Sequence, residues 1–323
     1  MFEMQPVVSV IIPTYNRSNY LKRSIQSVLE QTFTDFEVIV INNFSTDNTL
    51  EIIASFADTR IKVYNFKNDG IIAKSRNKGI MHSVGKYIAF LDDDDLWCPD
   101  KLELQVKVLN ENSDKHIIYS NAIIVDEHDA RKVLLLRPEQ PKVGQVFSDL
   151  VYENFVPILT VLIRREVYET IGPFSEDADL RGSEDYEYWL RASLVFNFEY
   201  MNKELALYRV HGGSISGAIN RPLLWQKVLR RFLVNSEVLP KYKNEIINSI
   251  ERINSDVSVY YWSISEKKEA KDYAKKYVVF NMKHYKLINM AAGMSLFVLI
   301  HFQYSKFAKL VNFAAKIRRP LGL

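Results

Sequence analysis

Residues 85–97 read GKYIAFLDDDDLW, so that an apolar segment leads directly into four consecutive aspartates. The segment YIAFL (87–91) has the unbroken apolar character of a strand that is covered on both faces of a sheet. In open parallel sheets, ligands bind beyond the carboxyl ends of the strands. We therefore expect the aspartates to lie in a binding crevice at the end of a buried strand.

Four adjacent carboxylates, Asp92 to Asp95, repel one another and favour a divalent cation. Hard oxygen ligands of this kind suit Mg²⁺ or Mn²⁺. Alternate residues of an extended segment point the same way, so Asp92 and Asp94 can act together. A cation held there could neutralise a diphosphate leaving group. The alternative is a solvated acidic turn before the next helix, with Asp95 alone as a helix cap.

The chain before this segment alternates between strand and helix patterns. Continuous apolar runs predict buried strands at VVSVII (7–12), FEVIVI (36–41) and IKVY (61–64). Apolar residues at helical spacing predict helices between them, one ending near Leu29 and the others over 46–56 and 71–84. Ser18 or Asn19 can cap the first of these helices. The alternation predicts an α/β fold with a mainly parallel sheet flanked by helices.

The rest of the chain has a different pattern. We expect Pro99 in the first turn of a helix that buries Leu102, Val106 and Leu109. From about residue 115 to 220 the pattern is mixed, with strands at HIIYSNAIIV and ILTVLIR and a helix at SEDYEYWLRASLV. After Arg221 the sequence is mostly helical. We expect a catalytic domain over 1–220, with halves at 1–115 and 116–220, and a helical region over 221–323.

The composition excludes several classes of protein. Hydrophobic residues make up 47% and charged residues 25%, as in an ordinary folded protein. Cys98 is the single cysteine, which excludes an intrachain disulfide framework and fits a reducing compartment. The N-terminal residues do not have the pattern of a signal peptide, so we expect a cytoplasmic protein. No phosphate-binding G-x-x-x-x-G-K-[ST] motif and no zinc-ligand spacing occurs in the sequence.

A series of motifs, in a characteristic order, resembles the family-two glycosyltransferases, which have the Rossmann-like GT-A fold. The resemblance covers about residues 7–217. The segments that carry it are VSVIIPTYNR (8–17), FEVIVI with NNFSTDNT (36–49), AKSRNKGI (73–80), GKYIAFLDDDDLW (85–97), SEDYEYWLR (183–191) and ALYRVHGGSIS (206–216).

The resemblance implies roles on the donor side of the site. Pro13, Thr14, Tyr15 and Asn16 would line the nucleoside pocket after the first strand. The residues after the second strand would read the base, and Arg76 would contact the nucleotide. Asp92, Asp93 and Asp94 would form the metal and diphosphate element, with His211 near the diphosphate or the metal.

On the acceptor side, the resemblance implies that Asp185 is the general base that deprotonates the acceptor hydroxyl. Glu184 is the alternative base. A base in this position must accept a proton as the hydroxyl attacks, and burial among other acids would raise its pKa in that direction. Trp189 would either contact the acceptor or belong to the core, and the role of Trp97 is open between structure and acceptor binding.

The sequence departs from the family after the second strand. The family usually has an Asp-Asp or Asp-Asn pair there, whereas this chain has Asn42 and Asn43. An asparagine amide can accept from the uracil N–H and donate to a uracil carbonyl, so Asn43 is compatible with a UDP-sugar. Thymine presents the same edge. Phe44 follows, where glycine is usual, and it would reshape the pocket.

The C-terminal part is basic. Residues 222–323 contain 18 Lys and Arg against 7 Asp and Glu, whereas residues 1–221 contain 24 against 32. The run 287–305 is borderline in length and polarity for a membrane span, and KFAKLVNFAAKIRR (306–319) resembles an interfacial helix on anionic lipid. The alternatives are peripheral membrane contact, a buried helix or homo-oligomer interface, a true span, or a solvated helical surface.

Taken together, these features predict an inverting, metal-dependent glycosyltransferase that adds one sugar at a time. The Q-x-x-R-W motif of processive synthases is absent from the sequence. The expected partners are a nucleotide-sugar donor, UDP-linked in the first instance, and a glycan or lipid-linked acceptor in bacterial capsule, lipopolysaccharide or other surface-polysaccharide synthesis. We expect no nucleic-acid partner. The alternatives are an inactive sugar-nucleotide-binding protein of the same fold and a nucleotidyltransferase.

Overall fold

The computed structural model describes residues 5–136, 142–212, 221–235 and 238–283. The chain divides into two compact units, Met1–Ile219 and Asn220–Leu323. Each unit is described by itself below.

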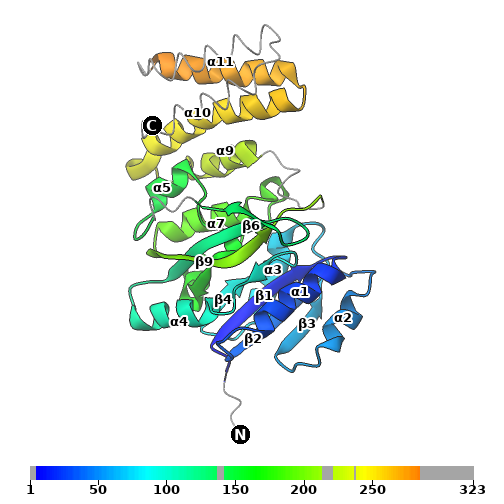
Figure 1. Cartoon of the computed structure of the whole chain (residues 1–323). Helices are drawn as coiled ribbons and strands as arrows, with labels where there is room; N and C mark the ends of the chain where they lie inside the picture. The colour runs from blue at the N-terminus through cyan, green and yellow to red at the C-terminus, as the bar shows by residue number, and fades with distance from the viewer. Residues whose placement is uncertain (1–4, 137–141, 213–220, 236–237, 284–323) are drawn as a thin grey trace. The chain divides into compact units, whose positions relative to one another are not determined.

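The first half of unit 1 is a parallel sheet with connecting helices (Figure 1). Its strands are β1 (Val8–Thr14), β2 (Phe36–Asn42), β3 (Ile61–Asn65) and β4 (Tyr87–Phe90), in the order β3-β2-β1-β4. The connections contain α1 (Ser18–Leu29), α2 (Thr49–Ser55) and α3 (Ile72–His82). The predicted α/β alternation is confirmed, and each strand predicted in this half lies within two residues of its observed bounds.

The second half of unit 1 extends the same sheet in a mixed pattern. The order continues from β4 through β8 (Leu162–Arg164), β6 (Ile117–Val125) and β9 (Phe198–Arg209) to β5 (Leu96–Trp97), and β7 (Arg131–Leu134) pairs with β6. Strand β8 is antiparallel to both neighbours, whereas β6 and β9 are parallel. The helical elements here are α4 (Lys101–Glu111), α5 (Phe147–Tyr152), η1 (Ile158–Thr160), α6 (Arg165–Ile171), η2 (Ala178–Leu180) and α7 (Glu184–Ser193).

The strand order predicts a binding crevice at the carboxyl ends of the central strands. From β1 the chain moves outward through β2 and β3, and then returns to add β4 on the other side of β1. At such a reversal the loops after the two central strands diverge, and ligands bind between them. Thr14 ends β1 and Asp92 comes shortly after β4. The fold therefore brings the motifs at 13–17 and 92–95 to the same edge.

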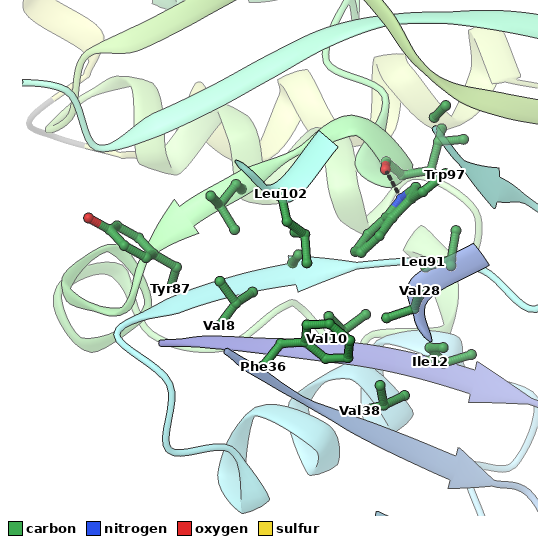
Figure 2. Close-up of a cluster of buried hydrophobic side chains, with 14 of the residues drawn as sticks. Val8, Val10, Ile12, Val28, Phe36, Val38, Tyr87, Leu91, Trp97 and Leu102 are labelled. Carbon is green, nitrogen blue, oxygen red and sulfur yellow. Dashed lines mark hydrogen bonds between the residues drawn. The ribbon is translucent and has the colours of Figure 1, made fainter. Parts of the chain in front are cut away.

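The core lies between β1 and the helices that cover its two faces. Figure 2 shows Val8, Val10 and Ile12 of β1 against Val28 of α1, and all four are 0% exposed. The intervening residue Ile11 faces the opposite side, toward α3. Full burial of one such aliphatic side chain contributes about 1.5–3 kcal/mol, so this alternation fixes the register of β1.

Trp97 and α4 complete this core. The Trp97 indole Nε1–H donates to the carbonyl of Leu159 at 2.7 Å, drawn as a dashed line in Figure 2, and the side chain is 4% exposed. Trp97 is therefore a structural residue in this conformation. Leu102, Val106 and Leu109 of α4 are buried as predicted.

Three local predictions were wrong. Neither Ser18 nor Asn19 caps α1, because the carboxylate of Asp47 accepts the Ser18 backbone N–H at 3.0 Å from the neighbouring loop. Pro99 precedes α4, whose N-cap is Asp100. The segment ILTVLIR is a strand only from Leu162, because a 3₁₀ turn occupies Ile158–Thr160.

Unit 2 is helical over its described residues, as predicted. It contains α9 (Arg221–Phe232), α10 (Leu239–Ser263) and α11 (Lys267–Lys283). The Ser258 hydroxyl of α10 donates to the carbonyl of Ala270 in α11 at 2.7 Å, and both residues are buried. Within the described ranges, no helix combines the length and apolarity needed to cross a bilayer. The segments 287–305 and 306–319, for which membrane contact was considered, lie outside the described residues.

Gly79 tests the packing of α3 on the sheet. A Cβ at this position would lie 2.4 Å from the Ile11 Cγ2 and 3.4 Å from the Ile41 Cγ1. We expect Gly79→Ala to lower the free energy of unfolding by about 1–3 kcal/mol, as overpacking of a filled core does. Urea denaturation measures the change. Met81→Ala on the same helix is the control, because Met81 is 70% exposed and should change stability little; equal stability of the two variants would contradict the packing argument.

Candidate functional site

The four aspartates after β4, residues 92–95, form a tight turn that we call the acid turn. The Asp95 backbone N–H donates to the carbonyl of Asp92 at 3.2 Å and closes it. The Ser24 hydroxyl of α1 reaches the carbonyls of Asp93 and Asp95 at 2.9 and 2.6 Å. Helix α1 thus fixes the backbone of the turn, and the four carboxylates diverge toward different partners.

Two of these carboxylates, Asp93 and Asp94, share one arginine. The guanidinium Nη1 of Arg17 lies 3.2 Å from the Asp93 Oδ1 and 2.6 Å from the Asp94 Oδ2. Asp93 also accepts from the Thr14 hydroxyl at 2.8 Å, and the Asp94 Oδ2 lies 3.0 Å from the His211 Nε2. The end of β1 and the loop after β9 therefore meet at the acid turn.

Burial shifts the pKa values of the more enclosed aspartates. Asp93 is 5% exposed, and burial together with the charge of Asp94 raises its pKa to about 7, although Arg17 and Thr14 act in the opposite direction. Burial raises the pKa of Asp95 well above its ordinary value, with Asp94 and Asp92 adding to the effect. Asp95 is 1% exposed and accepts the Arg209 backbone N–H at 2.8 Å, which is a structural role.

The remaining member of the turn, Asp92, belongs to a clamp around Arg76. The Arg76 Nη2 lies 2.8 Å from the Asp92 Oδ1, and its Nη1 lies 2.6 Å from the Glu184 Oε1. Arg76 is 3% exposed. Burial acts to lower the pKa of Arg76, but the charges of Asp92 and Glu184 outweigh it and raise the pKa, so the guanidinium stays charged. One buried cation thereby joins α3, the acid turn and the start of α7.

Glu184 and Asp185 are neighbours with different surroundings. Glu184 uses one oxygen for Arg76 and the other to accept the Gly182 backbone N–H at 2.7 Å. Asp185 accepts only the Tyr186 backbone N–H, at 2.7 Å, and forms no ion pair with any residue that the structure describes. Burial and the adjacent Glu184 charge raise the pKa of Asp185 to about 6. Asp185 therefore has fewer partners than Glu184 among the residues that the structure describes.

The loops after β1 and β2 are tied to each other. The Asn43 backbone N–H donates to the carbonyl of Thr14 at 3.0 Å, and the Asn16 side-chain oxygen accepts the Thr46 N–H at 2.7 Å. Pro13 lies within β1, and Tyr15 is 54% exposed beside it. The residues predicted to surround the nucleoside therefore form one connected edge.

The two asparagines after β2 differ in the hydrogen-bonding groups that their side chains have already used. Asn42 is 1% exposed, and its amide donates to the Asn65 side chain at 2.8 Å, so it serves the structure. The Asn43 side-chain oxygen accepts the Asn68 N–H at 3.0 Å. Phe44 adopts a left-handed backbone with φ 55°, which explains why glycine is usual there, and its ring is 57% exposed.

The match to known proteins decides the family. Residues 9–172 match the family described as glycosyl transferase family 2. The chain belongs to that family. TuaG of Bacillus subtilis (strain 168), whose name associates it with teichuronic acid biosynthesis, is 31% identical over 74% of this chain and 90% of its own length.

Solved structures agree on the GT-A fold of this glycosyltransferase. The S. aureus protein TarS 1-349, in complex with UDP-GlcNAc, superposes with a TM-score of 0.67 at 18% identity over 92% of each chain. The mannosyltransferase PcManGT of Pyrobaculum calidifontis, in complex with GDP-Man and Mn²⁺, gives a TM-score of 0.59 at 17% identity, over 98% of this chain and 88% of its own.

Two arginines of the glycosyltransferase's site were missed in the sequence. Arg17 directly follows the TYN motif, and its position at the end of β1 was the available signal. Arg209 is 2% exposed, and its side chain donates to the Asp94 carbonyl at 2.8 Å and pairs with Asp129 at 2.5 Å. Its signal was its place two residues before His211. Trp189 is 0% exposed beside Phe174, as the core interpretation expects.

The Arg76 clamp gives a stability prediction. Arg76→Met leaves Asp92 and Glu184 without their shared cation, and removing one member of a buried pair costs about 3–5 kcal/mol. Urea denaturation should show that loss. The double variant Arg76→Met/Glu184→Gln should recover part of it, because the new amide carries no charge and its oxygen can still accept the Gly182 N–H. Strictly additive losses would argue against the clamp.

Proposed function

We propose that this glycosyltransferase moves one sugar from a nucleotide-sugar donor to an acceptor hydroxyl with inversion at the anomeric carbon, in the assembly of a surface polysaccharide. The observation that carries the proposal is the Arg76 clamp, which connects Asp92 of the acid turn to the helix turn that bears Asp185. The reaction requires a site for the leaving diphosphate and a proton acceptor for the attacking hydroxyl, and the clamp connects the two segments proposed to supply them. The TuaG name supports the pathway class, and TarS with bound UDP-GlcNAc supports a UDP-sugar donor.

The donor site is proposed to include Mn²⁺ or Mg²⁺. Among the described residues, no three His, Cys, Asp or Glu side chains are placed to share one cation. Asp94 and His211 place a carboxylate oxygen and an imidazole nitrogen 3.0 Å apart, and carboxylate is a ligand type that suits Mn²⁺ or Mg²⁺. These two residues would hold the ion, and the donor's own diphosphate oxygens would supply further ligands. When bound, the ion would act as a Lewis acid that offsets charge on the leaving diphosphate.

The base is proposed to be Asp185. Its carboxylate takes the proton of the acceptor hydroxyl as that oxygen forms a bond to the anomeric carbon. The bond from this carbon to the diphosphate oxygen breaks on the opposite face, and the electron pair leaves with the nucleoside diphosphate. An α-linked donor therefore gives a β-linked product. Glu184 holds Arg76 in place and takes no proton in this scheme.

The nucleoside would lie at the edge formed by Thr14, Tyr15, Asn16 and Asn43. The Asn43 oxygen already accepts the Asn68 N–H, so its amide N–H₂ is the better available group, and it would donate to a carbonyl of the pyrimidine. The acceptor is proposed to be a glycan or a lipid-linked glycan, handled at the cytoplasmic side of the membrane.

A donor screen tests the proposed activity. The full chain is titrated with UDP-, GDP- and dTDP-sugars, each with Mn²⁺, Mg²⁺ or EDTA, while binding and slow donor hydrolysis are followed. We expect metal-dependent hydrolysis of at least one UDP-sugar. Binding without any turnover would instead favour an inactive binding protein, and pyrophosphate release from a nucleoside triphosphate would favour a nucleotidyltransferase.

Asp185→Asn should reduce transfer by about 10²–10⁴-fold, the usual contribution of a general base. Binding of UDP should be unchanged, because the substitution leaves the acid turn intact. Glu187→Gln is the control, since Glu187 pairs with Arg191 at 2.8 Å on the same helix. Transfer at the wild-type rate by Asp185→Asn would rule out this base.

The pH profile follows from the same residue. Asp185 accepts a proton only when ionised, and its pKa is raised to about 6. We expect kcat/KM to be constant above this pH and to fall about tenfold per pH unit below it. Steady-state assays from about pH 4.5 to 8.5 measure this profile; a midpoint near pH 4, the ordinary range of a solvated carboxyl, would assign catalysis to a carboxylate that is less buried.

His211→Ala should weaken Mn²⁺ binding in the presence of UDP by about tenfold or more, as the loss of a metal-site residue does. Electron paramagnetic resonance of free Mn²⁺ reports the affinity. His128→Ala is the matched control, because the His128 side chain is 84% exposed. Equal Mn²⁺ affinity in both variants would remove His211 from the proposed metal site.

A further inference from the structure

Arg17 contacts the Asp94 oxygen that would bind a metal ion in the proposed site. Its Nη1 lies 2.6 Å from the Asp94 Oδ2, and this is the same oxygen that lies 3.0 Å from the His211 Nε2. The guanidinium also reaches Asp93 at 3.2 Å. A divalent cation that joins Asp94 to His211 through this oxygen therefore competes with Arg17 for it.

Each carboxylate of the acid turn already has a partner from another part of the chain. Asp92 forms an ion pair with Arg76, and Asp93 and Asp94 form ion pairs with Arg17. Asp95 accepts a hydrogen bond from the Arg209 backbone N–H. Arg76 is enclosed at 3% exposure, whereas the Arg17 side chain is 25% exposed and begins at the junction of β1 and α1. Between Arg17 and Arg76, therefore, Arg17 is the one with room to move.

We propose that Arg17 is a built-in counter-ion that keeps the cation site closed until the donor arrives. The inference rests on the proposed function. A divalent cation that binds alone displaces the Arg17 guanidinium but stays close to it. The two cations then repel each other beside Asp93 and Asp94. A diphosphate adds negative charge that can compensate both cations. Binding of the cation and of the nucleotide is therefore positively coupled, and Arg17 is a positioning residue for the donor complex.

The coupling is measurable as a ratio of dissociation constants. Mn²⁺ is titrated into the full-chain protein without UDP and with saturating UDP, and free Mn²⁺ is followed by electron paramagnetic resonance. The ratio of the two constants is the coupling, and by linkage it is the same whichever ligand binds first. We expect the wild-type ratio to exceed that of Arg17→Met by about tenfold, within the usual range of such couplings, mainly because Arg17→Met binds Mn²⁺ alone more tightly.

Two further variants keep the test specific. Arg17→Lys retains a positive charge and should keep most of the wild-type coupling. Arg60→Met removes another partly exposed arginine, which pairs with Asp58 at 2.7 Å, and should leave the ratio unchanged. Circular dichroism melting checks that each variant is folded.

The outcomes separate the two proposals. If the wild type binds Mn²⁺ with UDP but Arg17→Met binds Mn²⁺ alone no more tightly than the wild type, the counter-ion role is overturned and the proposed function stands. If UDP fails to promote Mn²⁺ binding in every variant, the metal-dependent donor site is overturned together with the inference. A smaller ratio in Arg17→Met, with Arg17→Lys close to the wild type, supports the counter-ion.

Discussion

The crowding of negative charge at the end of β4 is the constraint to which the rest of unit 1 responds. Adjacent carboxylates repel, and burial strengthens the repulsion because the local dielectric is low. The compensating groups come from distant parts of the chain. Arg17 follows β1, Arg76 lies on α3, Arg209 ends β9, and His211 lies in the loop after it. The turn therefore holds together segments that the sheet alone would leave as independent loops.

The same charge balance separates two adjacent acids into different roles. Glu184 is saturated by Arg76 and the Gly182 N–H, whereas Asp185 has a single backbone donor and a raised pKa. Burial and the adjacent Glu184 charge raise the pKa of Asp185, whereas Arg76 acts in the opposite direction. In the proposed function, this contrast assigns Glu184 to the Arg76 clamp and Asp185 to proton transfer.

The sequence predicted the elements of the fold well, because its signals are local. The apolar runs at 7–12, 36–41 and 87–91 give the strands, and helical spacing gives Leu102, Val106 and Leu109 as a buried face. The errors came from non-local partners. The cap of α1 is Asp47 of another loop, and the mixed pairing of β8 depends on which strands it meets.

For the candidate site, too, the sequence predicted the local motifs but not their non-local partners. The motifs placed Thr14, Arg76, Asp92, Asp94, Asp185 and His211 at one edge, and the structure brings their elements together there. The sequence could not show that Arg17 lies on Asp93 and Asp94, since ion pairing across about 76 residues depends on the folded geometry. The resemblance favoured Asp185 over Glu184 as the base, but the sequence could not show that Glu184 pairs with Arg76, because both acids occupy the first turn of the same helix.

The long sequence separation between the acid turn and its partners Arg209 and His211 has a consequence for the synthesis and folding of this protein. Asp94 and His211 are 117 positions apart, and the Arg209 N–H that Asp95 accepts also comes late in the chain. A ribosome releases β1 to β4 well before it reaches β9. During that interval the nascent domain carries an aspartate cluster that lacks two of its partners. The parallel half therefore cannot reach its final stability as an independent folding unit, and completion of unit 1 is delayed until β9 emerges.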